Sequence, residues 1–224
     1  MKKLPMVKSA GELEALVMEI GFLPFFRGDI PGFSLEELTP PERWFKDGVE
    51  GPWEWRETAA ENGQIGYGKL VRGKAAFISP ELLPLLVNYR RDGYDYDARF
   101  DDGLMKRREK IVMDAVMENG PMLSPDIKKA CGFGKDGLKG FDGVMTALQM
   151  QTYLLVRAFE YKKDKHGVPY GWGVGRYAAP EMIFGAELVT GRYSQEPKES
   201  FAELVGLLSE RLEIPPESLQ KLLR

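Results

Sequence analysis

The strongest constraint on the fold is the order of elements in the middle of the chain. Three segments with helical spacing of apolar residues, 104–119, 124–131 and about 138–151, follow one another with glycine- and proline-containing breaks between them. Two extended segments, 153–161 and 168–178, come next and are joined by a short polar turn. Three helices followed by a β-hairpin is the element order of a winged helix-turn-helix, which this stretch is therefore expected to form.

The flanking segments complete an expected α+β fold. Two capping boxes, one from Ser9 to Glu12 and one from Ser34 to Glu37, mark helix starts. Residues 51–56, 65–71 and 74–78 are predicted to be short strands. We therefore expect a winged helix-turn-helix module that is preceded by a small mixed α/β unit and followed by C-terminal helices.

The expected division of the chain is a mixed α and β N-terminal unit over residues 1–100, the winged helix-turn-helix over 101–181, and a C-terminal helical segment over 182–224. Residues 200–212 in the last segment have the spacing of an amphipathic helix. Its apolar side either packs back on the body or pairs with a second copy, and the second arrangement would give a homodimer through the C-terminal helices.

Charge is divided unevenly along the chain. Residues 104–179 carry 13 Lys and Arg against 8 Asp and Glu, whereas the rest of the chain carries 18 basic and 26 acidic residues. A basic module attached to acidic parts is typical of a protein that contacts phosphate groups, although a solvated surface can have the same balance. DNA is the expected partner.

The third predicted helix has an apolar face between Phe141 and Leu148. Its opposite stripe offers Lys139 for phosphate contacts, and Thr146 and Gln149 for contacts with base edges, because this helix enters the major groove in helix-turn-helix proteins. A polar stripe is also the ordinary solvent face of an amphipathic helix. The turn of the predicted hairpin adds three candidate phosphate contacts: Lys162, Lys163 and Lys165.

Composition excludes several other kinds of site. The single cysteine, Cys131, rules out an intramolecular disulfide, and the single histidine, His166, has no evident ligand partners for a zinc site or a catalytic triad. Five aspartates between residues 92 and 102 suit either a hard cation or the capping of turns, but their spacing is not that of an EF-hand. We expect no cofactor and no metal.

The cellular location follows from the same composition. No apolar run approaches the roughly 18 to 20 residues that span a bilayer, so no membrane contact is expected. A single cysteine fits a reducing compartment. The expected location is the cytoplasm.

Aromatic residues in the N-terminal half suggest a platform for bases or for a small ligand. The candidates are Trp44, Trp53, Trp55, Tyr67 and Phe77. Aromatic side chains at strand positions also build hydrophobic cores, which is the competing interpretation.

Four short motifs carry a family resemblance: GPWEW at 51–55, YRRDG at 89–93, LQMQTYL at 148–154 and YGWGV at 170–174. With these motifs the chain resembles the AlkZ-like (YcaQ-type) DNA glycosylases, and more closely the short AlkZ-related proteins of unknown function. The glycosylases themselves are longer, use tandem winged helices and remove alkylated bases. Their catalytic signature is Gln, an apolar residue, then Gln or Asp. Gln149-Met150-Gln151 has this form, so the resemblance implies Gln149 and Gln151 as catalytic residues.

Three functions follow as hypotheses. The first is duplex DNA binding through the winged helix without intrinsic catalysis. The second is a DNA glycosylase or related base-repair enzyme that uses Gln149 and Gln151 to orient the attacking water. The third is a winged-helix module that binds another protein. Because the sequence offers one winged helix where the glycosylases use several, the non-enzymatic function is the leading hypothesis.

Overall fold

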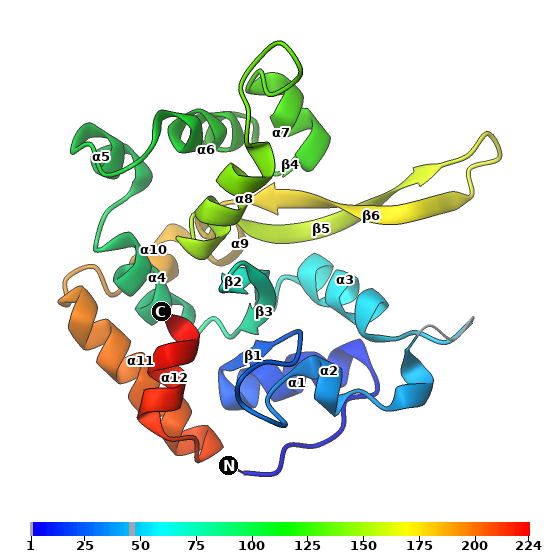
Figure 1. Ribbon diagram of the computed structural model, residues 1–224, viewed down its shortest axis with the longest axis vertical. Coiled ribbons are helices and arrows are strands. Elements are labelled where there is room, and N and C mark those ends of the chain that lie inside the picture. The colour runs from blue at the N-terminus through cyan, green and yellow to red at the C-terminus, as the bar shows by residue number, and fades with distance from the viewer. Residues whose placement is uncertain (1, 45–47) are drawn as a thin grey trace.

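The computed structural model describes residues 2–44 and 48–224. Its helices and its two three-stranded antiparallel sheets confirm the α+β class. Figure 1 shows the first sheet among the N-terminal helices, and the second sheet extended into a long hairpin that projects from the body.

The first sheet has the strand order β1-β3-β2. Its strands are β1 (Phe22–Pro24), β2 (Gly66–Val71) and β3 (Lys74–Ile78). As an edge strand, β2 leaves the backbone groups of its outer side for contacts with another element. The helices of this part are α1 (Ala10–Ile20), α2 (Leu35–Leu38), the 3-10 helix η1 (Pro41–Arg43), α3 (Pro52–Asn62) and α4 (Leu83–Arg91).

The two predicted capping boxes start helices as expected. The Ser9 Oγ accepts a hydrogen bond from the Glu12 N–H at 3.2 Å, which caps α1. The Ser34 Oγ accepts one from the Glu37 N–H at 3.3 Å, which caps α2. Each side chain satisfies a backbone donor that the first helical turn leaves unpaired.

The strand predicted over residues 51–56 is wrong, because this segment begins α3. Gly51 is the N-cap and its N–H donates to the Glu54 carboxylate at 2.8 Å, while Pro52 stands in the first turn, where its missing N–H costs nothing. Trp55 and Ala59, one helical turn apart, are buried. The helix start signals therefore outweigh the aromatic content that suggested a strand.

The middle of the chain contains every predicted helix and strand in the predicted order, together with a short helix, α5 (Tyr96–Asp101), and a short strand, β4 (Met122–Leu123), that were not predicted. The elements are α5, α6 (Arg107–Asn119), β4, α7 (Ser124–Ala130), α8 (Phe141–Met150), β5 (Leu155–Lys163) and β6 (Pro169–Ala178). The second sheet has the order β4-β6-β5. Helix α8 starts at Phe141 rather than near residue 138, because Gly140 with φ of 80° precedes it.

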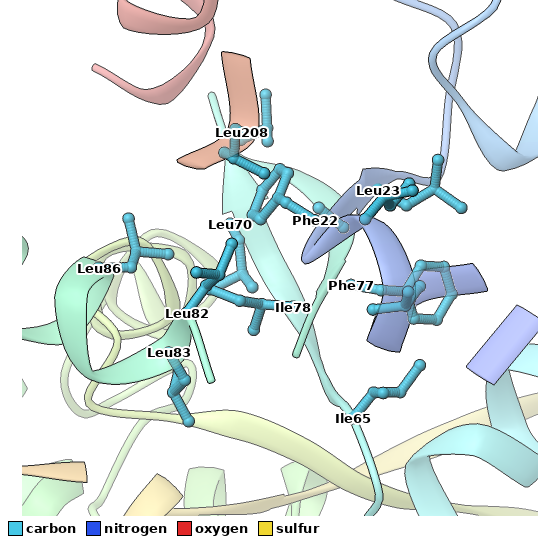
Figure 2. Close-up of a cluster of buried hydrophobic side chains, with 14 of the residues drawn as sticks. Phe22, Leu23, Ile65, Leu70, Phe77, Ile78, Leu82, Leu83, Leu86 and Leu208 are labelled. Carbon is cyan, nitrogen blue, oxygen red and sulfur yellow. The ribbon is translucent and has the colours of Figure 1, made fainter. Parts of the chain in front are cut away.

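The C-terminal helices pack back on the first part of the chain. They are α9 (Pro180–Phe184), α10 (Ala186–Val189), α11 (Pro197–Leu212) and α12 (Pro216–Leu223). The ring of Phe201 on α11 stacks on Tyr89 of α4 with 4.1 Å between centroids. Leu208 reaches the cluster that Phe22 and Leu82 build (Figure 2). The apolar side of α11 is thus used within the chain, and a homodimer through these helices would need other surfaces.

Buried side chains form two hydrophobic clusters. The first joins the N-terminal elements, the C-terminal helices and two residues of β5, Leu155 and Val156. The second lies between Met105 and Ala179 and contains the inner faces of α6, α7 and α8. Tyr177 of β6 is partly buried against both clusters. The start of the hairpin therefore connects the two parts of the molecule.

Candidate nucleic-acid interface

Two residues of the polar stripe of helix α8, Thr146 and Gln149, face the edge strand β2, whereas Asp142 at the start of the helix is exposed. The Gln149 side chain is 1% exposed, so the solvent-facing position that the helical pattern predicts for it is wrong. Its Oε1 accepts a hydrogen bond from the Lys69 N–H at 3.0 Å, and its Nε2 donates to the Met145 carbonyl at 3.0 Å. The Lys69 Nζ donates to the Thr146 Oγ at 2.9 Å. Thr146 and Gln149 thus hold α8 against the first sheet.

Glycines make this close approach possible. A Cβ on Gly68 would lie 3.4 Å from the Gln149 Oε1, and a Cβ on Gly73 would lie 3.4 Å from the Thr146 Cγ2. At 3.4 Å a lone Cβ would just reach van der Waals contact, so any longer side chain at Gly68 on β2, or at Gly73 in the turn between β2 and β3, would crowd α8. The helix lies this close to the sheet because both positions are glycine.

The remaining predicted residues of this helix region have separate environments. Lys139 is exposed just before α8, and its Nζ donates to the Gly134 carbonyl at 2.7 Å and also to the Lys135 carbonyl. Gln151 is half-buried, and its Nε2 lies 3.5 Å from the Glu109 Oε2 of α6. Gln149 and Gln151 therefore contact different elements, β2 and α6, instead of sharing a partner.

The predicted hairpin lysines, Lys162, Lys163 and Lys165, are exposed at the tip of β5 and β6. None of the three forms an ion pair with another described residue. Asp164 builds the turn, its Oδ1 accepting hydrogen bonds from the N–H groups of His166 and Val168 at 2.8 and 2.9 Å. Figure 1 shows the tip pointing away from α8, so the structure does not bring the lysines beside that helix.

The middle of the hairpin lies on α3 instead. The Tyr161 hydroxyl donates to the Glu57 Oε1 at 2.6 Å, and the Trp172 ring meets the Trp53 ring edge-on at 6.4 Å. Burial raises the pKa of Glu57 above its ordinary value. Burial and the hydrogen bond to Glu57 raise the pKa of Tyr161 to about 12. Tyr161 therefore remains a hydrogen-bond donor at neutral pH.

A pocket of about 310 Å³ lies where β2, β3, α8 and β5 meet. Three basic residues line it: Arg56, Lys69 and Lys74. The Arg56 guanidinium stands 4.5 Å from the ring centroid of Phe159 and 4.6 Å from that of Trp53, which are cation–π distances. Gln149 contributes to the wall of this pocket.

A second pocket of about 440 Å³ adjoins the first through Phe26, which lines both. Trp44 and Trp53 form its aromatic walls, and Arg27 and Glu36 supply its charged groups. We call the two pockets together the cleft. Sequence reasoning proposed Trp44 and Trp53 as an aromatic platform but missed the basic residues, which are spread over an acidic part of the chain.

Metal and membrane sites have no support among the residues that the structure describes. No group of three or more His, Cys, Asp or Glu side chains there could hold a metal ion. In the acidic segment, the Asp95 carboxylate caps α5 by accepting from the Ala98 N–H at 2.8 Å, and Asp97 pairs with Lys110 at 3.0 Å. None of the described helices has the length and apolar character needed to cross a membrane.

Comparison with known proteins relates the chain to one family. A family model described as AlkZ related matches residues 7–224, nearly the whole chain. Searches of curated proteins and of solved structures found no match. The chain therefore belongs to the AlkZ-related family.

Proposed function

We propose that this protein binds duplex DNA in a DNA-repair-related role, through its hairpin and the adjoining cleft. One observation carries the proposal: the hairpin projects from the body with three unpaired lysines at its tip and with Trp172 77% exposed behind them. Exposed cations beside a largely exposed aromatic ring contribute little to the packing of the chain, and they suit phosphates and bases. Membership of the AlkZ-related family supports the link to DNA repair.

The contacts have different roles in this proposal. Lys162, Lys163 and Lys165 bind phosphates along the hairpin, as the winged-helix hypothesis expects of a wing. Lys139 is exposed and adds a phosphate contact at the other end of the module. Thr146 and Gln149 position α8 on β2, so base edges are read, if at all, from the cleft and the hairpin.

A salt titration of binding to random duplex DNA tests the proposal. Changing the three hairpin lysines together to glutamate should abolish measurable binding at low salt. In a milder triple change to glutamine, the slope of log K against log salt should fall by about 2.7, which is about 0.9 for each lost phosphate contact.

The matched control changes three exposed lysines elsewhere, Lys3, Lys8 and Lys198, to the same residues. If the hairpin triple variant binds like the wild type, the proposal is wrong. If the control loses as much affinity as the hairpin variant, net charge and not the hairpin determines binding.

Base excision is a second candidate, because the chain belongs to the AlkZ-related family and contains Gln149-Met150-Gln151. Both ends of the Gln149 amide are hydrogen-bonded within the chain and the residue is 1% exposed, so it would orient a water molecule only after its amide leaves the Lys69 N–H and turns toward the cleft. Incubation with alkylated duplex DNA tests this activity. Abasic sites that disappear in Gln149→Ala and Gln151→Ala would support it, and their absence with the wild-type protein would exclude it for that substrate.

A further inference from the structure

The pocket between α3 and η1 has the form of an aromatic cage. The Trp44 and Trp53 rings meet edge-on at 6.2 Å and 84°, and the Phe26 ring lies 6.1 Å from that of Trp53 at 58°. The buried ring of Phe25 packs against Trp53 with 5.1 Å between the ring centroids. The cage is therefore fixed by the core on one side, while its other side opens into the second pocket of the cleft.

Trp172 of the hairpin reaches this cage from outside. Its ring touches Trp53 edge-on at 6.4 Å, yet 77% of the residue is exposed, more than for any other large apolar residue described. Exposing so large an apolar surface is unfavourable, and among the described residues only the ring of Trp53 lies next to it. Such a side chain is suited to a planar partner that stacks on its free face.

We propose that this cage holds an unstacked nucleobase, with Trp172 stacking on it, so that the protein prefers DNA with an unpaired nucleotide over a fully paired duplex. The inference rests on the proposed DNA binding and adds the class of DNA that is bound. Aromatic side chains accept every base because each base has a π face. An unpaired nucleotide lacks a pairing partner, so it costs less to remove from the stack.

The charges around the cage favour a nucleotide over a purely apolar partner. Arg27 lines the pocket, and the Arg56 guanidinium lies over the Trp53 ring at 4.6 Å. The Glu36 Oε2 accepts a hydrogen bond from the Arg27 N–H at 2.8 Å, and its other oxygen is a candidate acceptor for an exocyclic amino group. The lysine tip of the same hairpin would hold the phosphates next to the extruded base.

The size of the pocket agrees with this occupant. A volume of about 440 Å³ falls within the roughly 300 to 1,000 Å³ of ordinary small-molecule sites. A protein partner with an apolar segment would also cover Trp172, but seven basic residues of the cage, the neighbouring pocket and the hairpin tip favour a phosphate-bearing ligand. They are Arg27, Arg56, Lys69, Lys74, Lys162, Lys163 and Lys165.

The test compares two DNA duplexes that differ only in one extra nucleotide. One is fully paired, and the other carries a single bulged 2-aminopurine, whose fluorescence falls when the base stacks on an aromatic ring. Fluorescence anisotropy at one salt concentration gives both affinities. The wild-type protein should bind the bulged duplex more tightly and should quench its 2-aminopurine.

Trp172→Ala should weaken binding to the bulged duplex by roughly 5- to 140-fold, the range for removal of one stacking aromatic, and should weaken binding to the paired duplex less, so that the preference for the bulged duplex falls. Trp172→Phe should keep the preference because the ring remains. Tyr170→Ala is the matched control, since Tyr170 is 53% exposed on the same strand. It should behave like the wild type.

The outcomes separate this inference from the proposed function. If the wild-type protein binds the two duplexes equally well, the cage is not a base site, while the proposed DNA binding stands. The same follows if Trp172→Ala keeps the wild-type preference for the bulged duplex. Absence of binding to both duplexes overturns both proposals. Since Trp172 is an exposed side chain, a variant with the wild-type melting temperature confirms that folding is not the cause of a loss.

Discussion

Arg91 is the residue whose removal should most weaken the connection between the two parts of the molecule. It lies at the end of α4 and only 2% of its side chain is exposed. Its guanidinium pairs with Glu181 of α9, and it donates to the Tyr193 hydroxyl at 3.1 Å and to the Thr152 carbonyl at 2.7 Å. Thr152 directly follows α8 in a left-handed conformation with φ of 62°. We expect Arg91→Met to destabilise the protein strongly.

The magnitude follows from the partners that lose their donor. Removing one member of a buried ion pair costs about 3 to 5 kcal/mol. We expect a cost in the lower half of this range, because 22% of the Glu181 side chain is exposed and its carboxylate can be hydrated when Arg91 is lost. The Thr152 carbonyl loses a charged donor, which adds about 1 to 2 kcal/mol. Methionine keeps the packing of the aliphatic stem. The expected total is therefore about 4 to 6 kcal/mol.

Thermal unfolding followed by circular dichroism measures this loss. For a chain of 224 residues, each kcal/mol lowers the melting temperature by about 2 to 4 °C, so Arg91→Met should melt roughly 8 to 24 °C below the wild type. Because Arg91 joins α4 to the end of α8, a second transition should also become visible as the two hydrophobic clusters unfold separately.

The control is Arg192→Met. Arg192 pairs with Glu203 at 3.1 Å, but 45% of its side chain is exposed, so its loss should cost about 0 to 1 kcal/mol. If Arg91→Met melts within about 2 °C of the wild type, or no lower than the control, the ion pair does not connect the two parts as the geometry indicates.

Two further substitutions test the candidate site and the start of helix α3. Burial raises the pKa of Glu57. The wild-type protein therefore loses stability as the pH rises through that pKa and Glu57 ionises, whereas a glutamine at this position does not ionise. The melting temperature of Glu57→Gln relative to the wild type should increase between about pH 4 and about pH 7. A difference that does not change with pH would contradict this. Gly51→Ala should cost about 1 to 3 kcal/mol in chemical denaturation, because its Cβ would lie 2.2 Å from the Arg43 carbonyl oxygen. A Cβ added at Gly206 would have no atom outside its own helix backbone within 4 Å, so Gly206→Ala should stabilise α11 by about 0.5 to 1 kcal/mol. A similar loss of stability in both variants would refute the argument.

Local signals predicted most of the elements because their causes are local. Ser9 and Ser34 accept hydrogen bonds from residues three positions away, and the hairpin turn is built by hydrogen bonds to Asp164 within four residues. The order of helices and strands from 107 to 178 could therefore be inferred from the sequence. The error over residues 51–56 arose because aromatic content was weighed above the Gly-Pro helix start.

Contacts between distant segments could not be predicted in this way. Lys69 and Gln149 are 80 residues apart in the sequence, and their hydrogen bond involves a backbone N–H that no sequence pattern reports. Helical spacing identifies the apolar side of α8, but a second buried side made of polar contacts looks like a solvent face. The basic residues of the cleft, Arg27, Arg56, Lys69 and Lys74, come together only in the fold.

The contact between α8 and β2 also distinguishes the two DNA-related functions. As the chain is folded, Gln149 is covered and Thr146 is half-buried, so the proposed DNA binding uses the hairpin and the cleft while Gln149 positions α8. Base excision with Gln149 facing the substrate would require its amide to leave the Lys69 N–H, which would cost about 1 to 3 kcal/mol if that donor stayed buried and unpaired. Binding energy from the hairpin and the cage would have to offset this cost. A DNA complex in which α8 stays on β2 therefore argues for binding without catalysis by Gln149, and one in which it moves argues for excision.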